Sequence, residues 1–174
     1  MIGGRASYSD WLLHRAKNIQ LKKSSAKFQD FNAKLAYILN DNNKLSYSGY
    51  YSADGFSFAS DTAFTWTTQN HVLSWDHIIS DVASIKAKYA IGRYMYDIES
   101  DEGVLPFTIN SKIDYQNLSV EFEKEFSERN TFLAGAETYL YKFSPGHRKP
   151  LSDNPNNEEI RLEHEKSLEG AIYI

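Results

Sequence analysis

The sequence has 174 residues but no cysteine, and it holds only four prolines and two methionines. Without cysteine the chain forms no disulfide, no zinc–thiolate centre and no thiol nucleophile, which fits a reducing compartment. No apolar run approaches the roughly 18 residues of a membrane-spanning helix, and the first ten residues lack the apolar core of a signal peptide. We therefore expect a cytoplasmic protein that makes no membrane contact.

Several motifs of known catalytic chemistry are also missing. There is no glycine-rich phosphate loop, no GxSxG serine motif and no HExxH zinc motif. The five histidines are scattered, so a histidine metal site would need residues that are distant in the sequence. We expect a protein that binds rather than catalyses, with no cofactor.

Aromatic residues and an uneven charge distribution are what the sequence does contain. Twelve tyrosines and ten phenylalanines suit both sheets and contact surfaces, because tyrosine brings a large area with a polar tip. The net charge of −4 combines +5 over residues 1–50 with −7 over residues 97–137, and the two remaining segments carry −1 each. The chain can present two faces of opposite sign to a partner, or these charges can pair within the fold.

The clearest local pattern predicts a helix over residues 74–89. Ser74 stands where an N-cap belongs, and Asp76 places a negative charge in the first turn. Apolar residues then recur mainly at steps of three and four, as on one face of a helix. These residues are Trp75, Ile78, Ile79, Val82, Ile85 and Tyr89.

Short aromatic strands precede this helix between residues 45 and 68. Leu45 and Tyr47 alternate with Ser46 and Ser48, and residues 53–55 supply a turn. Together with possible strands at 92–96 and 106–110, they predict a small antiparallel sheet packed by helices. The fold class we predict is therefore α+β.

Further helices are predicted at both ends of the chain. Their ranges are 10–23, 28–39, 115–140 and 158–168. Residues 106–126 are compatible with either strand or helix. The Pro/Asn-rich residues 144–157 read as a linker, which divides the chain into a 1–143 domain, the linker and a 158–174 helix and tail.

The order of elements between residues 40 and 95 resembles that of a known family. A GFSF strand after an Asp-Gly turn leads through a further strand to a helix that opens with Ser-Trp and closes near a tyrosine. The matching residues are Gly55, Phe56, Phe58, Leu73, Ser74, Trp75, Ile78, Val82, Ile85 and Tyr89. The stretch is similar to large polyvalent protein-associated domains, which accompany helicases and DNA methylases on conjugative elements and phages.

That resemblance implies a mobile-element setting and no defined activity. Lys86, Ala87 and Lys88 stand where the family usually has a glycine. By size and composition alone, the chain also resembles anti-CRISPR and other anti-defence proteins. We therefore expect an accessory protein of a phage or mobile element that inhibits a defence system by binding nucleic acid or a nucleoprotein complex.

Two groups of basic residues are candidates for the nucleic-acid contact. Trp11, Arg15, Lys22 and Lys23 combine a stacking ring with cations that neutralise phosphates. A second basic group lies at Arg148 and Lys149.

The alternative is a metal-dependent nuclease. Asp97, Glu99, Asp101 and Glu102 place four carboxylates within six residues, and such oxygen ligands hold Mg²⁺ or Mn²⁺ in two-metal sites. They are equally typical of a solvated acidic loop. A third hypothesis is a structural module that docks another protein through its tyrosine-rich surface.

Overall fold

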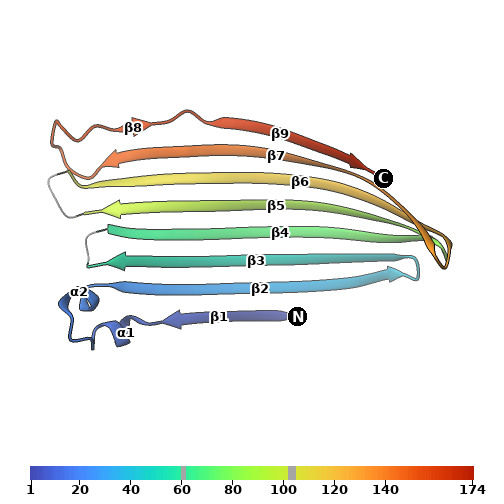
Figure 1. The fold of residues 1–174 in the computed structure, drawn as a ribbon, viewed down its shortest axis with the longest axis horizontal. Coiled ribbons are helices and arrows are strands. Elements are labelled where there is room, and N and C mark those ends of the chain that lie inside the picture. Colours follow the sequence, from blue (N-terminus) through green and yellow to red (C-terminus); the bar gives the residue numbers. More distant parts are fainter. Residues whose placement is uncertain (60–61, 102–104) are drawn as a thin grey trace.

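The computed structural model describes residues 1–59, 62–101 and 105–174. In this described part the chain forms one antiparallel sheet of nine strands, and β1 to β8 follow the chain order (Figure 1). The ninth strand pairs with β7, along the same edge as β8. The strands are β1 (Ile2–Tyr8), β2 (Ser25–Asn40), β3 (Asn43–Phe58), β4 (Thr62–Ser80), β5 (Ala83–Ser100), β6 (Phe107–Ser127), β7 (Asn130–Pro150), β8 (Ile160–Arg161) and β9 (Glu165–Tyr173).

The two ends of the sheet differ in their connections. Three hairpins, β2–β3, β4–β5 and β6–β7, turn through only two residues each, and a register irregularity precedes each turn. We call this the turn end; it lies on the right in Figure 1. The opposite, loop end carries longer connections, including α1 (Asp10–Leu13) and α2 (Ile19–Lys22) between β1 and β2.

The predicted α+β architecture is wrong, because the helix expected at 74–89 does not exist. Its residues belong to the facing halves of β4 and β5, joined by the two-residue turn at 81–82. Ile78 before this turn and Val82 within it are each 47% exposed, whereas a helix packed on a sheet would have buried both. The spacing of three and four arises because apolar residues alternate along both strands and the register shifts between Ile78 and Ser80, just before the turn.

The other predicted helices are also replaced, almost entirely by strands. Residues 28–39 lie in β2, residues 115–140 span β6 and β7, and residues 158–168 run through β8 into β9. The helix expected at 10–23 is reduced to the single turns α1 and α2. Ser9 does not cap α1 with its side chain; its hydroxyl donates to the carbonyl oxygen of Ala26 at 2.5 Å instead.

The expected strands agree better with the structure. The predicted strand stretches within 45–68 lie in β3 and β4, although residues 53–55 continue β3 without a turn. Residues 92–96 are part of β5, and residues 107–126 are strand. The expected linker at 144–157 begins within β7 and continues into the segment before β8.

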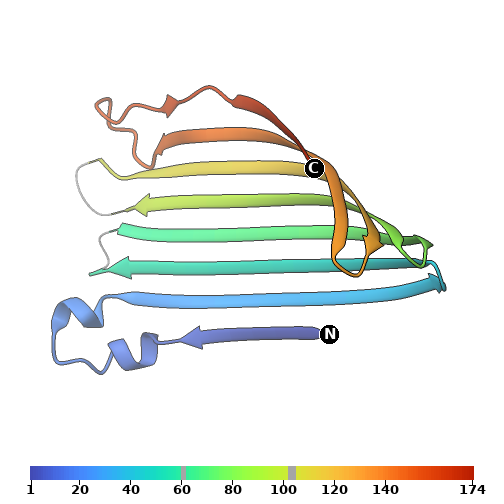
Figure 2. The same ribbon diagram turned by 45° about the vertical axis from the view of Figure 1, so that its right-hand side comes forward.

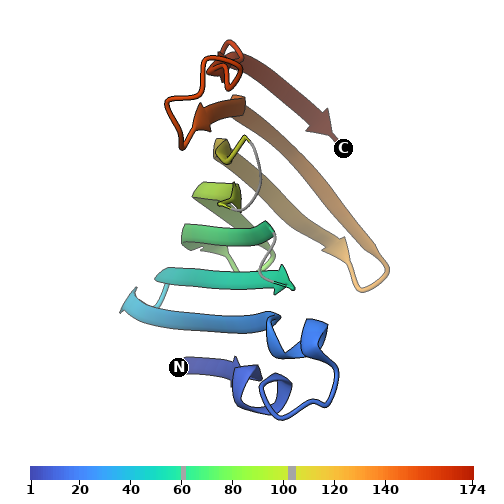
Figure 3. The ribbon, with the colours of Figure 1, turned by 90° about the vertical axis from the view of Figure 1, so that its left-hand side faces the viewer.

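The sheet is a single twisted layer without a hydrophobic interior. Figures 2 and 3 show no second sheet or helix layer over either face, and Figure 3 shows the strands near β9 inclined to those near β1. Among the described residues, Ala90 is the only buried hydrophobic one, and no large side chain is fully buried. A chain of this length ordinarily buries most of its apolar surface. In this sheet, by contrast, many large apolar side chains remain exposed.

Candidate functional site

The strand register assigns every side chain of the sheet to one of two faces, because residues paired across antiparallel strands point the same way. Face A carries Leu73, Tyr89 and Leu118, which are register partners in β4, β5 and β6. Face B carries their alternating neighbours, such as Lys88 and Ser119. The two faces differ in composition, and that difference defines the candidate site.

An apolar band crosses face A near the turn end. It covers seven strands, β2 to β7 and β9, and on each of them apolar or small side chains dominate. Six strand spacings and six residue steps make it about 29 Å wide and 20 Å tall, or roughly 600 Å². Its members are Ala33, Leu35, Tyr37, Leu45, Tyr47, Gly49, His71, Leu73, Trp75, Ile85, Ala87, Tyr89, Ile91, Gln116, Leu118, Val120, Phe122, Ala134, Ala136, Thr138, Leu140, Leu168, Gly170 and Ile172.

Nothing in the described structure covers this band. Leu73, Leu118 and Leu140 are 46%, 50% and 46% exposed, although they lie near the middle of long strands. An apolar patch of this size equals or exceeds the largest patch on a typical soluble monomer, which is about 300–600 Å². The band therefore marks a contact surface.

Polar groups in the middle of the band are hydrogen-bonded within the sheet. The Tyr47 hydroxyl and His71 Nδ1 are 2.7 Å apart, and the Tyr89 hydroxyl donates to Gln116 Oε1 at 3.1 Å. The Thr138 hydroxyl donates to a β9 backbone carbonyl at 2.9 Å. These contacts reduce the cost of removing the band from water.

The Trp75 indole at the turn side of the band is satisfied in the same way. Its Nε1 donates to Asn43 Oδ1 at 3.0 Å, and His77 Nδ1 lies 2.9 Å from the same oxygen. The rings of Trp75 and His77 stack with centroids 5.3 Å apart. The band thus ends on β4 with Trp75, whose ring stacks on His77 and whose indole N–H is hydrogen-bonded.

Face B is strongly polar at the level of the band. Lys44, Asp76, Lys86 and Glu121 are successive register partners, so charges of alternating sign lie side by side across four strands. Lys86 Nζ is 3.4 Å from Asp76 Oδ1, and Glu121 accepts a hydrogen bond from Tyr173 at 3.0 Å. Such a surface is stable in water, so the two faces of the same strands suit different solvents.

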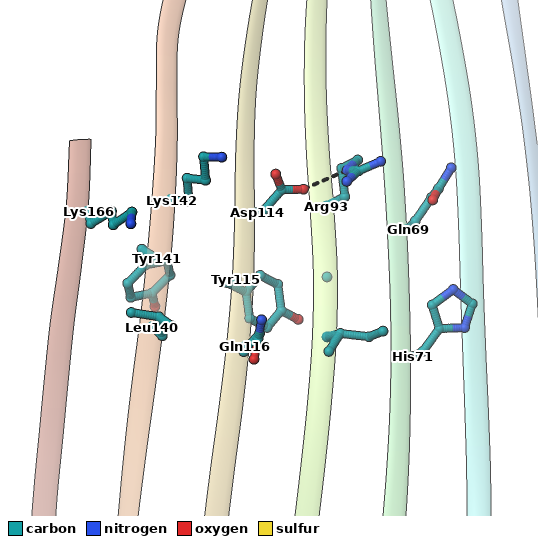
Figure 4. A pocket seen from close by; sticks show the side chains of 12 residues that line it. Gln69, His71, Arg93, Asp114, Tyr115, Gln116, Leu140, Tyr141, Lys142 and Lys166 are labelled. Carbon is teal, nitrogen blue, oxygen red and sulfur yellow. Dashed lines mark hydrogen bonds and ion pairs between the residues drawn. The ribbon is translucent and has the colours of Figure 1, made fainter. Parts of the chain in front are cut away.

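A row of charged residues limits the band on its loop side. Gln69, Arg93, Asp114, Lys142 and Lys166 are successive register partners on face A, and Figure 4 shows them at one level across the strands. They line a shallow cleft of about 630 Å³ together with apolar residues of the band. From β4 to β7 and on β9, the polarity of face A thus changes within two residues along the strand.

Face B near the loop end carries stacked aromatic rings. Trp66 stacks on Tyr96 with centroids 5.7 Å apart, and Phe64 stacks on both. Tyr141 stacks between its β7 neighbours, Tyr139 and Phe143, at 5.7 Å from each. Burial, followed by nearby acidic and tyrosine side chains, raises the pKa of Tyr141 above its usual value, so this phenol stays protonated near neutral pH.

The residues predicted to bind nucleic acid are not gathered into one surface. Arg15 lies over the Trp11 ring at 5.5 Å, while Lys22 and Lys23 lie in and directly after α2, all near β1 and β2. Arg148 and Lys149 lie on β7, five strand spacings from β2, or about 24 Å.

Arg148 is also engaged within the fold. It donates to the Glu158 carbonyl at 2.7 Å and to Asn157 Oδ1 at 2.8 Å. Its guanidinium lies 4.8 Å from the centroid of the Phe107 ring. This arginine ties the segment before β8 to the sheet.

The acidic residues proposed as metal ligands are dispersed as well. Asp97 and Glu99 lie on face A of β5, and Asp97 accepts a hydrogen bond from Asn110 at 2.6 Å. Asp101 follows β5, and Glu102 lies outside the described residues. Within the described ranges, no three His, Cys, Asp or Glu side chains are grouped to hold a metal ion.

Sequence reasoning missed the apolar band, although a signal for it was present. Ile85, Ala87, Tyr89 and Ile91 alternate with lysines and other residues, which is the period of a strand with one apolar face. This alternation was overlooked because residues 75–89 were interpreted as a helix from their spacing of three and four.

In the part of the chain that the structure describes, no helix is long and apolar enough to cross a membrane. Comparison of the chain with protein-family models, with curated proteins and with solved structures gave no match.

Proposed function

We propose that this sheet spans a lipid bilayer, with the apolar band of face A against the acyl chains and face B toward water. The observation that carries the proposal is the band itself, confined to one face and one level of seven strands and opposite a ladder of charges. In that arrangement face B lines an aqueous passage for polar solutes.

The length of the apolar stretch on two strands supports hydrocarbon as the partner of the band. On β5 and β7 the apolar alternation continues one step beyond the band toward the turn end, from Ala83 to Ile91 and from Phe132 to Leu140, which is nine residues on each of these two strands. A strand that crosses a bilayer at a tilt needs about 9–11 residues.

Two further features support the same partner. Hydrogen bonds such as Tyr89 to Gln116 satisfy polar groups that would find no water in hydrocarbon. The sheet also has two-residue turns at one end and longer connections at the other, an asymmetry typical of membrane-spanning antiparallel sheets. Because unpaired strand edges are not tolerated in hydrocarbon, this arrangement requires further strands to pair with the edge of β2 beyond Ala33, where β1 ends, and with the outer edge of β9.

Fluorescence of single tryptophans in vesicles tests the proposal, because two of the three tryptophans lie on opposite faces. Trp75 belongs to the band, whereas Trp66 lies on face B near the loop end. A Trp11→Phe/Trp66→Phe protein retains Trp75 alone, and a Trp11→Phe/Trp75→Phe protein is the matched control with Trp66 alone.

We expect bromine atoms on the acyl chains of phosphatidylcholine to quench Trp75 and leave Trp66 unaffected. Aqueous acrylamide should quench Trp66 more than Trp75. If bromolipids quench neither tryptophan and acrylamide quenches both, the band does not face lipid. That outcome would favour the sequence-based prediction of a cytoplasmic protein that binds nucleic acid or nucleoprotein.

A further inference from the structure

The charged row that borders the apolar band has an excess of positive charge. Arg93, Lys142 and Lys166 lie on β5, β7 and β9 at one level, with Asp114 between the first two. Lys112 lies one row further toward the loop end on the same face. Four cations and one carboxylate give this group, which we call the cationic row, a net charge of +3.

The ion pairs in the cationic row leave two ammonium groups available. Asp114 accepts a hydrogen bond from Arg93 Nε at 2.6 Å and lies 3.0 Å from Lys112 Nζ, so it pairs with both. Among the described residues, no carboxylate lies within ion-pair distance of Lys142 or Lys166, and both are exposed. Asp97 is the next acidic residue of β5 on this face, two rows toward the loop end, where Asn110 binds it.

The position of the row relative to the band identifies its ligand. Leu140 and Leu168 of the band lie two residues from Lys142 and Lys166 on the same strands and the same face. A lipid whose acyl chains lie along these leucines therefore places its head group beside the two ammonium groups. Cations at the rim of a membrane surface attract anionic lipids through their phosphates.

We propose that Lys142 and Lys166, supported by Arg93, form a binding site for the phosphate of an anionic lipid. The inference rests on the proposed function, because it needs the band in the bilayer. It also accounts for the asymmetry of the row: over β2 and β3 the same level is occupied by the neutral aromatic residues Phe31 and Tyr51. The site belongs to the β5–β9 side of the sheet.

Spin-labelled lipids measure this selectivity directly. The protein is reconstituted in phosphatidylcholine, and the fraction of immobilised label is compared for phosphatidylglycerol and phosphatidylcholine carrying the label on an acyl chain. The test variant is Lys142→Gln/Lys166→Gln. The matched control is Lys44→Gln/Lys88→Gln, which removes two lysines from face B of the same sheet.

We expect the wild type and the control to prefer phosphatidylglycerol and the test variant to lose that preference. Each lysine near an anionic surface contributes about 1 kcal/mol, so removing two should lower the preference about five- to thirty-fold. Inorganic phosphate should not compete with the labelled lipid, because it lacks the acyl chains that the band holds.

Other outcomes would overturn the site. They are an unchanged preference in the test variant, an equal loss in the control, or full competition by inorganic phosphate. Bromolipid quenching of Trp75 in the same samples separates this failure from that of the proposed function. Quenching without lysine-dependent selectivity leaves the membrane-spanning sheet standing and removes only the phosphate site.

Discussion

A charged side chain substituted at the centre of the apolar band tests whether the band faces lipid or water. Leu118 lies in the middle of the band, between Tyr89 and Thr138, and is 50% exposed. If that half-exposed leucine faced water, Leu118→Arg would forfeit at most about 1 kcal/mol of burial. If it faces hydrocarbon, the arginine costs about 2–4 kcal/mol near the bilayer midplane.

The neighbouring residue provides the control for this substitution. Ser119 points to face B, between Lys88 and Glu137, so Ser119→Arg should change stability by no more than about 0.5 kcal/mol. Phe31→Arg, in the row that borders the band, should cost only about 0–1 kcal/mol because it lies near the interface.

Urea unfolding of the protein in phosphatidylcholine vesicles measures these differences. The expected order of destabilisation is Leu118→Arg, then Phe31→Arg, then Ser119→Arg. Equal costs for the arginines at positions 118 and 119 would refute the assignment of face A to lipid.

Three further predictions concern other parts of the sheet. Burial alone would raise the pKa of Asp114, but hydrogen bonds from Arg93 and Lys112 lower it. The ionised form of Asp114 therefore stabilises the fold above about pH 4. Unfolding midpoints should show that the stability advantage of the wild type over Asp114→Asn vanishes when the pH is lowered below that value. Asn43→Ala should leave the Trp75 Nε1 without its acceptor and destabilise the protein by about 0.5–1.5 kcal/mol, with a shifted Trp75 emission maximum as a second readout. The nucleic-acid hypothesis stays a prediction: it requires that the affinity for nucleic acid fall steeply with salt concentration and disappear in the Arg15→Glu/Lys22→Glu/Lys23→Glu variant. Binding in a gel-shift assay that changes with neither salt nor these substitutions would argue against it.

Sequence reasoning found strand character where alternation was uninterrupted. In β3, Leu45 and Tyr47 alternate with serines. As predicted, the structure places Leu45 and Tyr47 on one face of the sheet and the serines on the other. It failed where the alternation passed through a hairpin, since Ile78 and Ile79 before the turn and Val82 within it filled the gaps of a helical pattern. Local spacing does not distinguish one helix from two short apolar stretches joined by a turn.

The apolar band was harder to predict from the sequence than the strands. The apolar band exists only when seven strands are aligned, so no local window contains it. Gln69 and Lys166, for example, are almost a hundred residues apart and lie in one row. Of the charged residues in that row, only Asp114 lies in the acidic segment 97–137, whereas Arg93, Lys142 and Lys166 come from outside it, so a charge count along the chain does not reveal the excess of cations on face A.

The meander has a consequence for how such a chain changes length. Each strand from β2 to β7 pairs with its predecessor and successor in the sequence, so a two-strand hairpin is a self-contained unit. Insertion or loss of one hairpin returns the backbone to the same end of the sheet and keeps the alternation of the remaining strands in phase. Loss of a single strand would reverse the direction of every strand after it and exchange the turn end with the loop end. Duplication or deletion of a hairpin-coding segment can therefore widen or narrow this sheet in steps of two strands while leaving the register of the rest intact.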